Sequence, residues 1–378
     1  MKKVCFILSA SNTKGSNGTF IELLDSLDRN RFKPYVILPA NGPIVHQLEI
    51  RDIPFKIFYY KWWMHVENSP KWKWAARFII NFVALPRICC QVLKWRCNII
   101  YTNTIVINVG LFAAIILRKP HIFHIHEFGY ADHKLIFDFW KNFSLKVANK
   151  FTSYFICVSQ AIADEYLAFI EKNKLKVVYQ SVKLPNETSN RFDFKKHNFQ
   201  CVIVGRLAEG KGQEDAIRAI GILREEGLDV GLWIVGDGDL KYKKYLEKIV
   251  EENDIGENIV FCGWHDNPLL FIKKADVTLI CSRCEGFGRV TVEAMLCGKP
   301  VIGADSGGTR EIIKDGHNGL LYPPRNFLEL SQKIRRLMFD PQKRKKLAKI
   351  AQSEAIRKFQ QKSYGKEIGE IIGSIVRF

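Results

Sequence analysis

Two glutamates stand eight positions apart in the segment EGFGRVTVEA, which runs from Glu285 to Ala294. Two glycines surround Phe287 directly after the first glutamate. The spacing fits neither one face of a helix nor one face of a strand, whereas a short loop that leads into a helix would accommodate it. Because the first amides of a helix have no partners within the helix, such a junction is suited to binding an anion.

A second segment with similar potential is GRLAEGKG (205–212), which follows an apolar run and precedes a helical pattern. Arg206 and Lys211 supply positive charge, and the glycines, with Gly205 first among them, allow the backbone to approach a phosphate closely. The letters from Gly205 to Lys211 also fit the P-loop pattern GxxxxGK. However, Gly212 stands where a P-loop requires the Ser or Thr that binds magnesium, so we do not expect a P-loop.

Two more glycine-containing segments follow apolar runs of the same half. GDGD (236–239) contributes Gly236 and Gly238 but lacks the third glycine of a dinucleotide fingerprint. SGGTREIIKDGHNGLLYPP (306–324) places two glycines before a helix start. Each segment alone could be an ordinary turn, but several such loops at strand ends of one domain favour a nucleotide site.

The elements that must position these loops alternate along the chain. Short Val/Ile/Phe-rich runs, apolar enough for a sheet buried on both faces, are separated by helical stretches. This alternation predicts parallel βαβ units. The expected strands are 4–8, 35–38, 55–58, 98–102, 121–125, 154–158 and 176–179, then 200–205, 230–236, 258–263, 276–281, 299–303 and 319–322.

We therefore predict an α/β protein with two Rossmann-like doubly wound domains facing a central cleft, where ligands of such sheets bind. The first domain is expected over 1–183 and the second over 200–360. The polar stretch 184–199 is expected to be the linker, and the end of the chain, 361–378, is expected to be a helix that returns to the first domain.

The composition is that of a globular protein, but its formal net charge of +18 implies an anionic partner. The ten cysteines show one CxxC pair, Cys281 and Cys284, without the second pair that a zinc site usually needs, so we expect reduced thiols and no metal. We expect no secretory signal and no transmembrane segment, since the longest mostly apolar stretch, 105–117, is too short to cross a bilayer.

The excess charge is concentrated in the segment 59–97, which carries seven Lys and Arg residues against Glu67 alone, together with five tryptophans. Tryptophan and lysine beside apolar helix positions are typical of a membrane interface. We interpret this segment as a helical hairpin that contacts an anionic membrane surface. The alternative is an ordinary buried helix whose basic face is exposed to solvent. No recognised nucleic-acid motif accompanies it, so we expect no nucleic-acid partner.

Taken together, GRLAEGKG, EGFGRVTVEA and GKPVIGADSGGTREIIKDGHNGLLYPP resemble the retaining glycosyltransferases of family 4, which have the two-Rossmann GT-B fold. In the first half the similarity is carried by NIIYTN, HIFHIHEFG and ICVSQAIADEYL. The resemblance implies transfer of a hexose from a nucleotide diphosphate donor, expected to be UDP-linked, with retention at the anomeric carbon. It also implies that no metal or other cofactor is required.

The resemblance assigns roles to particular residues. Glu285 is expected to meet the donor sugar hydroxyls and Glu293 the ribose hydroxyls, since a carboxylate can accept two hydrogen bonds from vicinal hydroxyls. His126 matches the family's histidine near the donor sugar, and Arg206 and Lys211 match its diphosphate-binding pair. The backbone amides of Phe287, Gly288 and Arg289 are expected to approach the diphosphate. Gly286 is also expected to bind the substrate.

Two departures from the family pattern lie in the first half. KGSNGTF replaces the usual glycine pair, so only Gly15 or Gly18 could bind substrate there, and Gln180-Ser181 replaces the usual Asn-Gly. We expect a cytoplasmic enzyme, peripheral on the inner face of the membrane, that glycosylates a lipid-linked glycan acceptor in surface polysaccharide biosynthesis. The alternatives are a hydrolase with paired carboxylates, a nucleotide-sugar epimerase, and a non-catalytic nucleotide or nucleic-acid binder.

Overall fold

The computed structural model describes residues 1–13, 15–67, 69–70, 72–183, 197–359 and 361–375. The chain forms two compact units: Met1–Ser181 with Gln361–Phe378, and Val182–Gln360. Most of the expected linker, 184–196, lies outside the described residues, and its last residue, Phe199, already begins a strand of the second unit.

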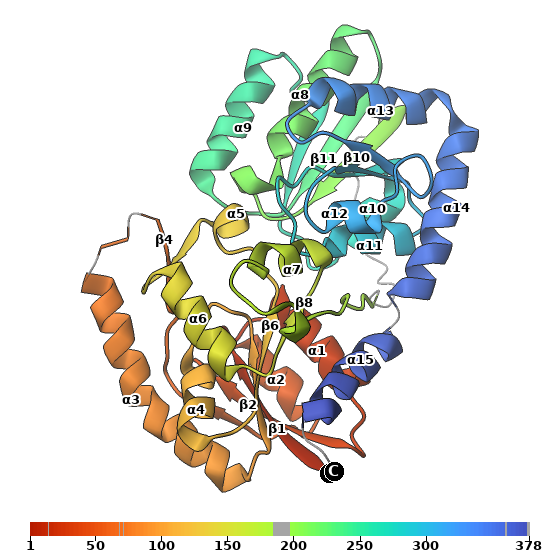
Figure 1. The fold of residues 1–378 in the computed structure, drawn as a ribbon. Coiled ribbons are helices and arrows are strands. Elements are labelled where there is room, and N and C mark those ends of the chain that lie inside the picture. Colours follow the sequence, from red (N-terminus) through yellow and green to blue (C-terminus); the bar gives the residue numbers. More distant parts are fainter. Residues whose placement is uncertain (14, 68, 71, 184–196, 360, 376–378) are drawn as a thin grey trace. The chain divides into compact units, whose positions relative to one another are not determined.

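The first unit is built on a seven-stranded parallel sheet of order β3-β2-β1-β5-β6-β8-β9 (Figure 1). Its strands are β1 (Lys2–Leu8), β2 (Phe32–Leu38), β3 (Phe55–Ile57), β5 (Ile99–Asn103), β6 (His121–Ile125), β8 (Tyr154–Cys157) and β9 (Leu175–Val177). Its helices are α1 (Ser16–Ser26), α2 (Pro43–Glu49), α3 (Trp72–Trp95), α4 (Val109–Leu117), α5 (Tyr130–His133), α6 (Lys141–Phe151), α7 (Gln160–Tyr166) and α15 (Gln361–Ile375), with a short 3₁₀ turn at Lys172–Lys174.

The last helix, α15 (blue in Figure 1), packs beside α1 (red) in the first unit. Glycines recur every fourth residue along α15 at positions 365, 369 and 373. A Cβ atom on Gly365 would lie 2.2 Å from the Ser26 carbonyl oxygen, a distance that real Cβ atoms essentially never show. The absence of a side chain at Gly365 therefore lets the backbones of the two helices approach this closely.

The second unit contains a six-stranded parallel sheet of order β12-β11-β10-β13-β14-β15. Its strands are β10 (Phe199–Val204), β11 (Val230–Val235), β12 (Ile259–Gly263), β13 (Val277–Ile280), β14 (Val301–Ala304) and β15 (Leu320–Tyr322). Its helices are α8 (Gln213–Glu225), α9 (Leu240–Glu252), α10 (Leu269–Lys274), α11 (Arg289–Leu296), α12 (Thr309–Ile312), α13 (Phe327–Phe339) and α14 (Pro341–Lys358), with a 3₁₀ turn at Glu209–Lys211.

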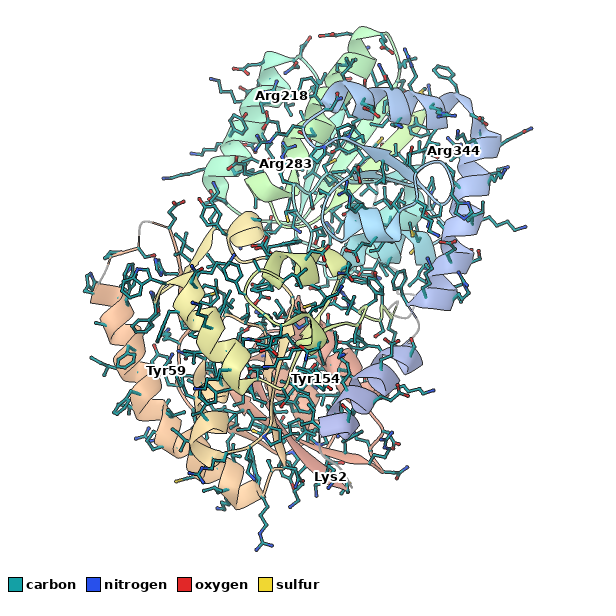
Figure 2. The ribbon with its side chains drawn as sticks, in the orientation of Figure 1. Lys2, Tyr59, Tyr154, Arg218, Arg283 and Arg344 are labelled. Atoms are coloured by element: carbon teal, nitrogen blue, oxygen red, sulfur yellow. The ribbon has the colours of Figure 1, made fainter. Side chains whose placement is uncertain are left out.

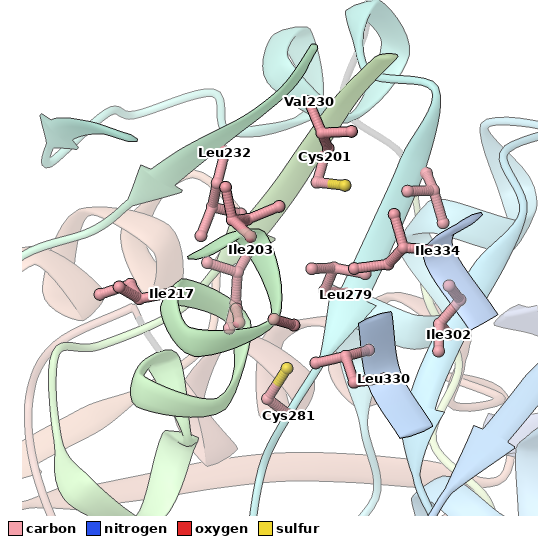
Figure 3. Close-up of a cluster of buried hydrophobic side chains, with 14 of the residues drawn as sticks. Cys201, Ile203, Ile217, Val230, Leu232, Leu279, Cys281, Ile302, Leu330 and Ile334 are labelled. Carbon is pink, nitrogen blue, oxygen red and sulfur yellow. The ribbon is translucent and has the colours of Figure 1, made fainter. Parts of the chain in front are cut away.

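Apolar strand residues of this unit point into a core that the helices cover (Figure 3). Cys201 and Leu279, on the neighbouring strands β10 and β13, belong to the same buried cluster as Ile334 of α13. Burial on both faces explains why these strands are continuous apolar runs without the polar alternation of a half-exposed strand.

Every strand expected from the sequence is present, and both sheets are parallel as predicted. A small antiparallel sheet was not predicted: β4 (Met64–Val66) pairs with β7 (Leu135–Phe137). The interpretation of 59–97 as a helical hairpin is wrong, because its first part is extended and runs into β4, and α3 is the one helix among the residues of this segment that the structure describes.

The full length of α3 was not predicted either. Within the part of the chain that the structure describes, α3 is the one helix long and apolar enough to cross a membrane, judged by length and composition alone. It nevertheless packs against α4 and buries Ala84, Ile88 and Val92 against the first unit. These contacts place α3 on the surface of the first unit, with its opposite face exposed.

Candidate functional site

The strand order of the second sheet brings the two main glycine-containing loops together. In a doubly wound sheet, ligands bind where the direction of strand addition reverses, beyond the carboxyl ends of the strands. Here this point lies between β10 and β13, which are adjacent and parallel. The loop Gly205–Gly212 follows β10 and the loop that contains Glu285 follows β13, so both lie at this edge.

A direct contact joins these loops. The Lys211 Nζ atom lies 2.8 Å from Glu285 Oε2, and both side chains are partly exposed, by 33% and 21%. The two groups are therefore paired with each other yet accessible to a ligand. Arg206, on the same loop as Lys211, has an exposed side chain, and its carbonyl oxygen accepts a hydrogen bond from Gln213 Nε2 at 2.9 Å.

Most glycines of these loops allow the backbones of neighbouring loops to pack closely against one another. A Cβ atom on Gly212 would lie 2.1 Å from the Cys281 carbonyl oxygen, and one on Gly236 would lie 2.2 Å from that of Gly205. Gly238 meets Leu207 in the same way. Gly205 itself would place a Cβ in open space, so among these glycines it is the one whose free face can receive a ligand.

The loop-to-helix junction expected after Glu285 is present. Gly288, with φ of 102°, caps the start of α11, and Arg289 and Glu293 face each other across one helical turn with 3.9 Å between Nη2 and Oε1. Glu285 therefore lies in the loop and Glu293 in the helix. The Glu285 carbonyl oxygen is fixed by the Gly308 amide, which donates to it at 2.7 Å.

The remaining residues of the junction and the neighbouring turn pack against the loop that contains Glu285. Phe287 is buried and packs edge-on against Phe359, with 5.5 Å between the ring centroids. Gly286, beside it, is half-buried. A Cβ atom on Gly307 would lie 2.5 Å from the Glu285 carbonyl oxygen, so the 306–308 turn lies directly against the loop.

A buried ion pair beneath these loops was not predicted from the sequence. Arg283, shown in Figure 2, makes two hydrogen bonds to the carboxylate of Asp215, and its backbone amide donates to the Gly210 carbonyl at 2.8 Å. Asp215 also accepts from the Tyr322 hydroxyl at 3.3 Å and from the Arg325 amide at 3.0 Å. This single carboxylate therefore ties together α8 and the segments that follow β13 and β15.

In the first unit, His126 lies in a chain of side-chain hydrogen bonds. Its Nε2 atom is 2.9 Å from Asn103 Oδ1, and its Nδ1 atom is 2.9 Å from Gln180 Nε2. Because the Gln180 amide nitrogen can only donate, Nδ1 accepts and Nε2 carries the proton. The Thr19 hydroxyl donates to the Gln180 carbonyl oxygen at 3.3 Å, which fixes the orientation of that amide.

The sequence showed Gln180 only as a departure from the family pattern. In the structure it sets the tautomer of the candidate catalytic histidine. Asn103, at the end of β5, was not singled out either, although its position at the carboxyl end of a strand beside β6 was the available signal. Gly15, with φ of 54°, precedes α1 and would place a Cβ in open space, whereas Gly18 lies within α1 against the Thr13 carbonyl oxygen.

Next to His126, the buried carboxyl group of Glu127 has its pKa raised to about 8, mainly by burial and then by the nearby Asp132. Its Oε1 atom accepts from the Ile105 amide at 3.1 Å. A raised native pKa stabilises the fold at pH values below the unfolded pKa, and this contribution is lost as the pH rises through 8. Burial lowers the pKa of His121 to about 3. Its contribution to stability is therefore present above the unfolded pKa and decreases as the pH falls below 6.5.

The candidate residues are thus divided between the two units. The first unit holds His126, Gly15 and Gly18. The second unit brings the other candidates to one sheet edge, across the neighbouring loops after β10, β11 and β13. Within the described residues, no group of three or more His, Cys, Asp or Glu side chains is placed to hold a metal ion.

Each unit is a doubly wound α/β domain, and in the second unit the glycine-containing loops meet at the switch point of the sheet. This arrangement is that of the GT-B class of proteins. Two family models match the chain: Glycosyltransferase Family 4 over residues 13–184, and Glycosyl transferases group 1 over residues 186–354. The chain therefore belongs to the GT-B glycosyltransferases, with a family 4 domain followed by a group 1 domain.

Individual relatives agree with this assignment. An uncharacterised glycosyltransferase of Methanocaldococcus jannaschii is 29% identical over 327 residues, which are 85% of this chain and 80% of the relative. The poly(glycerol-phosphate) alpha-glucosyltransferase of Bacillus subtilis is 32% identical over 40% of this chain and 23% of its own length. The crystal structure of HepE from Anabaena in complex with UDP has a TM-score of 0.79 at 26% identity and covers 99% of this chain and 100% of HepE.

Proposed function

We propose that this enzyme transfers a hexose from a UDP-linked donor to a lipid-linked glycan acceptor, with retention at the anomeric carbon and without a metal ion, in surface polysaccharide biosynthesis. The observation that carries the proposal is the contact between Lys211 and Glu285 at the switch point of the second sheet. It places a cation and a carboxylate side by side, which are the two groups that a sugar diphosphate needs at the junction between its sugar and its phosphates.

In the proposed reaction the donor loops stabilise the leaving group. Negative charge builds on the diphosphate as the bond to the sugar breaks, and the fixed cations Lys211 and Arg206 together with the first amides of α11 stabilise it. Glu285 orients the sugar through its hydroxyls. Because Lys211 and Glu285 form an ion pair before the donor binds, their side chains are preorganised, and donor binding requires little rearrangement of the two loops.

Similarity to characterised proteins supports the choice of donor. HepE, at 26% identity over nearly the whole chain, was crystallised with UDP and with UDP-glucose. The glucosyltransferase of B. subtilis is named for an α-linked product, which supports retention because UDP-hexoses are themselves α-linked. His126, held as the Nε2-protonated tautomer, is the histidine proposed to bind the donor sugar.

The exposed face of α3 supports a peripheral position on the inner face of the membrane. Three of the five tryptophans of segment 59–97 are partly or fully buried: Trp63, Trp74 and Trp95. The exposed apolar side chains of α3 instead form a stripe along one face: Trp72, Phe78, Ile79, Phe82, Val83 and Leu93. The stripe extends onto Phe139, whose ring meets that of Phe78 with 5.8 Å between centroids.

Exposed basic residues border this apolar stripe, including Lys73, Arg87 and Lys94. An apolar helix face with a basic margin suits an anionic bilayer, where each basic residue near the surface contributes about 1 kcal/mol. Flotation with anionic vesicles tests the proposal: the parent should float, and a Phe78→Ser/Phe82→Ser variant should remain at the bottom. The matched control is Leu240→Ser, an exposed leucine of the second unit, which should float like the parent.

Sugar transfer is tested by incubating the enzyme with radiolabelled UDP-hexoses and a bacterial membrane extract, then measuring label in the lipid fraction. We expect incorporation by the parent, a loss of about 100-fold or more in Glu285→Gln, and no change in Glu251→Gln, whose carboxylate lies on the exposed face of α9. Conversion of the donor to another nucleotide sugar without transfer would instead indicate an epimerase. Donor binding without any turnover would indicate a non-catalytic protein.

A further inference from the structure

The first unit contains a cavity of about 720 Å³ that the donor assignment leaves unexplained. It is formed by the loops after β1 and β2, the extended segment from Tyr59 to Val66, and the first turns of α3. It therefore opens at the carboxyl ends of the parallel strands, where doubly wound sheets bind their ligands. Its volume is sufficient for a saccharide of one or two rings.

The walls of the cavity are fixed by hydrogen bonds. The Tyr60 hydroxyl donates to the Leu8 carbonyl oxygen at 2.5 Å, which ties the extended segment to the end of β1. The Trp62 Nε1 atom donates to the Ser9 carbonyl oxygen at 3.0 Å. On the other side, Asn81 of α3 makes two hydrogen bonds with the backbone of Lys61, at 2.8 and 3.0 Å.

The lining is both aromatic and cationic. Tyr59 and Trp62 are 60% and 39% exposed. The Lys61 ammonium group lies over one face of the Tyr59 ring, so the other face of Tyr59 and the exposed part of Trp62 are available for stacking by a ligand. Three cationic side chains line the cavity, Lys61, Lys73 and Arg77, and none of the described residues that line it is acidic. This combination is suited to a ligand with a flat apolar surface and a negative charge.

Only part of this positive charge is already neutralised. Arg77 makes two hydrogen bonds to the buried carboxylate of Asp138, which also lies 2.8 Å from His65 Nδ1. Lys61 and Lys73, by contrast, have their ammonium groups 4.8 Å and 5.7 Å from the ring centroids of neighbouring aromatic residues. Among the described residues, no carboxylate lies within 4 Å of either ammonium group, so both can pair with a ligand anion.

We propose that this cavity is the acceptor site and that it selects a saccharide that carries a phosphate ester. The sugar ring would lie against Tyr59 and Trp62, its hydroxyls near Ser11 and Asn41, and its phosphate between Lys61 and Lys73, since lysine binds phosphate as a point charge. This inference rests on the proposed function, because it names the acceptor class of the same transfer reaction.

The phosphate could belong to a soluble sugar phosphate or to a glycolipid. Helix α3 connects the cavity with the apolar stripe, because Lys73 lines the cavity and the stripe starts at the adjacent Trp72. A lipid chain attached to the phosphate would therefore leave the cavity close to the apolar stripe. The two sources are separated by the choice of probes.

The test is calorimetric binding of three probes to the full chain: dodecyl glucosyl phosphate, its neutral counterpart dodecyl glucoside, and glucose 1-phosphate. We expect the lipid phosphate to bind about tenfold more tightly than the neutral glycolipid, and this preference to disappear in Lys61→Gln/Lys73→Gln. Lys33→Gln, which removes an exposed charge near the amino end of the first sheet, should retain it.

Glucose 1-phosphate binding as tightly as the lipid phosphate would assign the site to a soluble sugar phosphate. Selective binding of the lipid form would assign it to a glycolipid. Equal affinity for the charged and neutral glycolipids, or a preference that survives the double substitution, would overturn the inference. UDP binding by the double variant is measured in parallel: if it is unchanged, the result concerns the acceptor site alone and leaves the donor site untouched.

Discussion

The buried carboxylate of Asp215 allows a sharp test of how the donor loops are held. Asp215→Asn keeps the shape of the side chain but removes its charge, while Arg283 remains in place. The exposed fractions of the two side chains are 3% and 18%, so the arginine would lose its counter-ion in a largely water-free setting. The same substitution weakens the hydrogen bonds from the Tyr322 hydroxyl and the Arg325 amide.

Removing one partner of a buried ion pair typically costs about 3–5 kcal/mol, because the other charge is left uncompensated. For a unit of this size, each kcal/mol corresponds to a shift of about 2–4 °C in the midpoint of thermal unfolding. We therefore expect the second unit of Asp215→Asn to unfold about 6–20 °C below that of the parent. UDP binding should weaken as well, since the substituted carboxylate no longer fixes the loops after β10 and β13.

Hydrogen exchange measured by mass spectrometry in increasing urea reports the stability of each unit separately. The amides of β10 and β13 should lose protection in Asp215→Asn, while those of β1 and β5 should not. Asp305→Asn is the matched control, because Asp305 pairs with Arg310 at the surface, where both side chains are about half exposed, and such pairs contribute roughly 0–1 kcal/mol. Equal protection in Asp215→Asn and Asp305→Asn would refute the reasoning.

Three further predictions follow from the first unit. Gly365→Ala should destabilise the packing of α15 on α1 by about 1–3 kcal/mol in chemical denaturation, whereas Gly256→Ala, which meets no atom within 4 Å, should not; equal stability would contradict the close approach. As the pH rises from 6.5 towards 8, ionisation of Glu127 should lower the free energy of unfolding of the parent by roughly 1.4 kcal/mol per pH unit, and Glu127→Gln should lack this decrease. Urea titration at each pH measures it, and parallel curves for the two proteins would contradict the raised pKa. Gln180→Leu should lower kcat about tenfold with little change in the donor KM, because His126 loses the donor that fixes its tautomer; an unchanged kcat would contradict this role.

The sequence was informative about the sheets because most strands are short apolar runs, largely buried on both faces and bounded by polar segments. The edge strands β3 and β9 are exceptions, since their residues are only partly buried or exposed. The sequence was not informative about β4 and β7, which are three-residue strands with mixed burial and no periodic pattern. The length of α3 was missed because basic residues and Pro86 interrupt an otherwise apolar helix, although the surrounding packing makes the helix continuous.

For the candidate site, the glycine-containing loops could be recognised because their spacing is local. The partners that position them could not be recognised, because they are brought together only by the fold. Arg283 and Asp215 are 68 residues apart, and Gln180 and His126 are 54 residues apart. Similarly, the tryptophans of 59–97 indicated a membrane interface by type, but only packing shows that Trp63 and Trp74 point inward and that phenylalanines occupy the exposed face.

In the proposed function, the loops at the switch point of the second sheet bind the diphosphate of a nucleotide sugar. Calorimetric titration of UDP into the parent and into Lys211→Met tests it most directly, with Lys241→Met, an exposed lysine of α9, as the control. We predict binding by the parent and by Lys241→Met, and affinity weaker by about tenfold or more in Lys211→Met, as expected for a lost charge-assisted hydrogen bond to phosphate. Equal affinity in all three proteins, or no UDP binding by the parent, would contradict the claim.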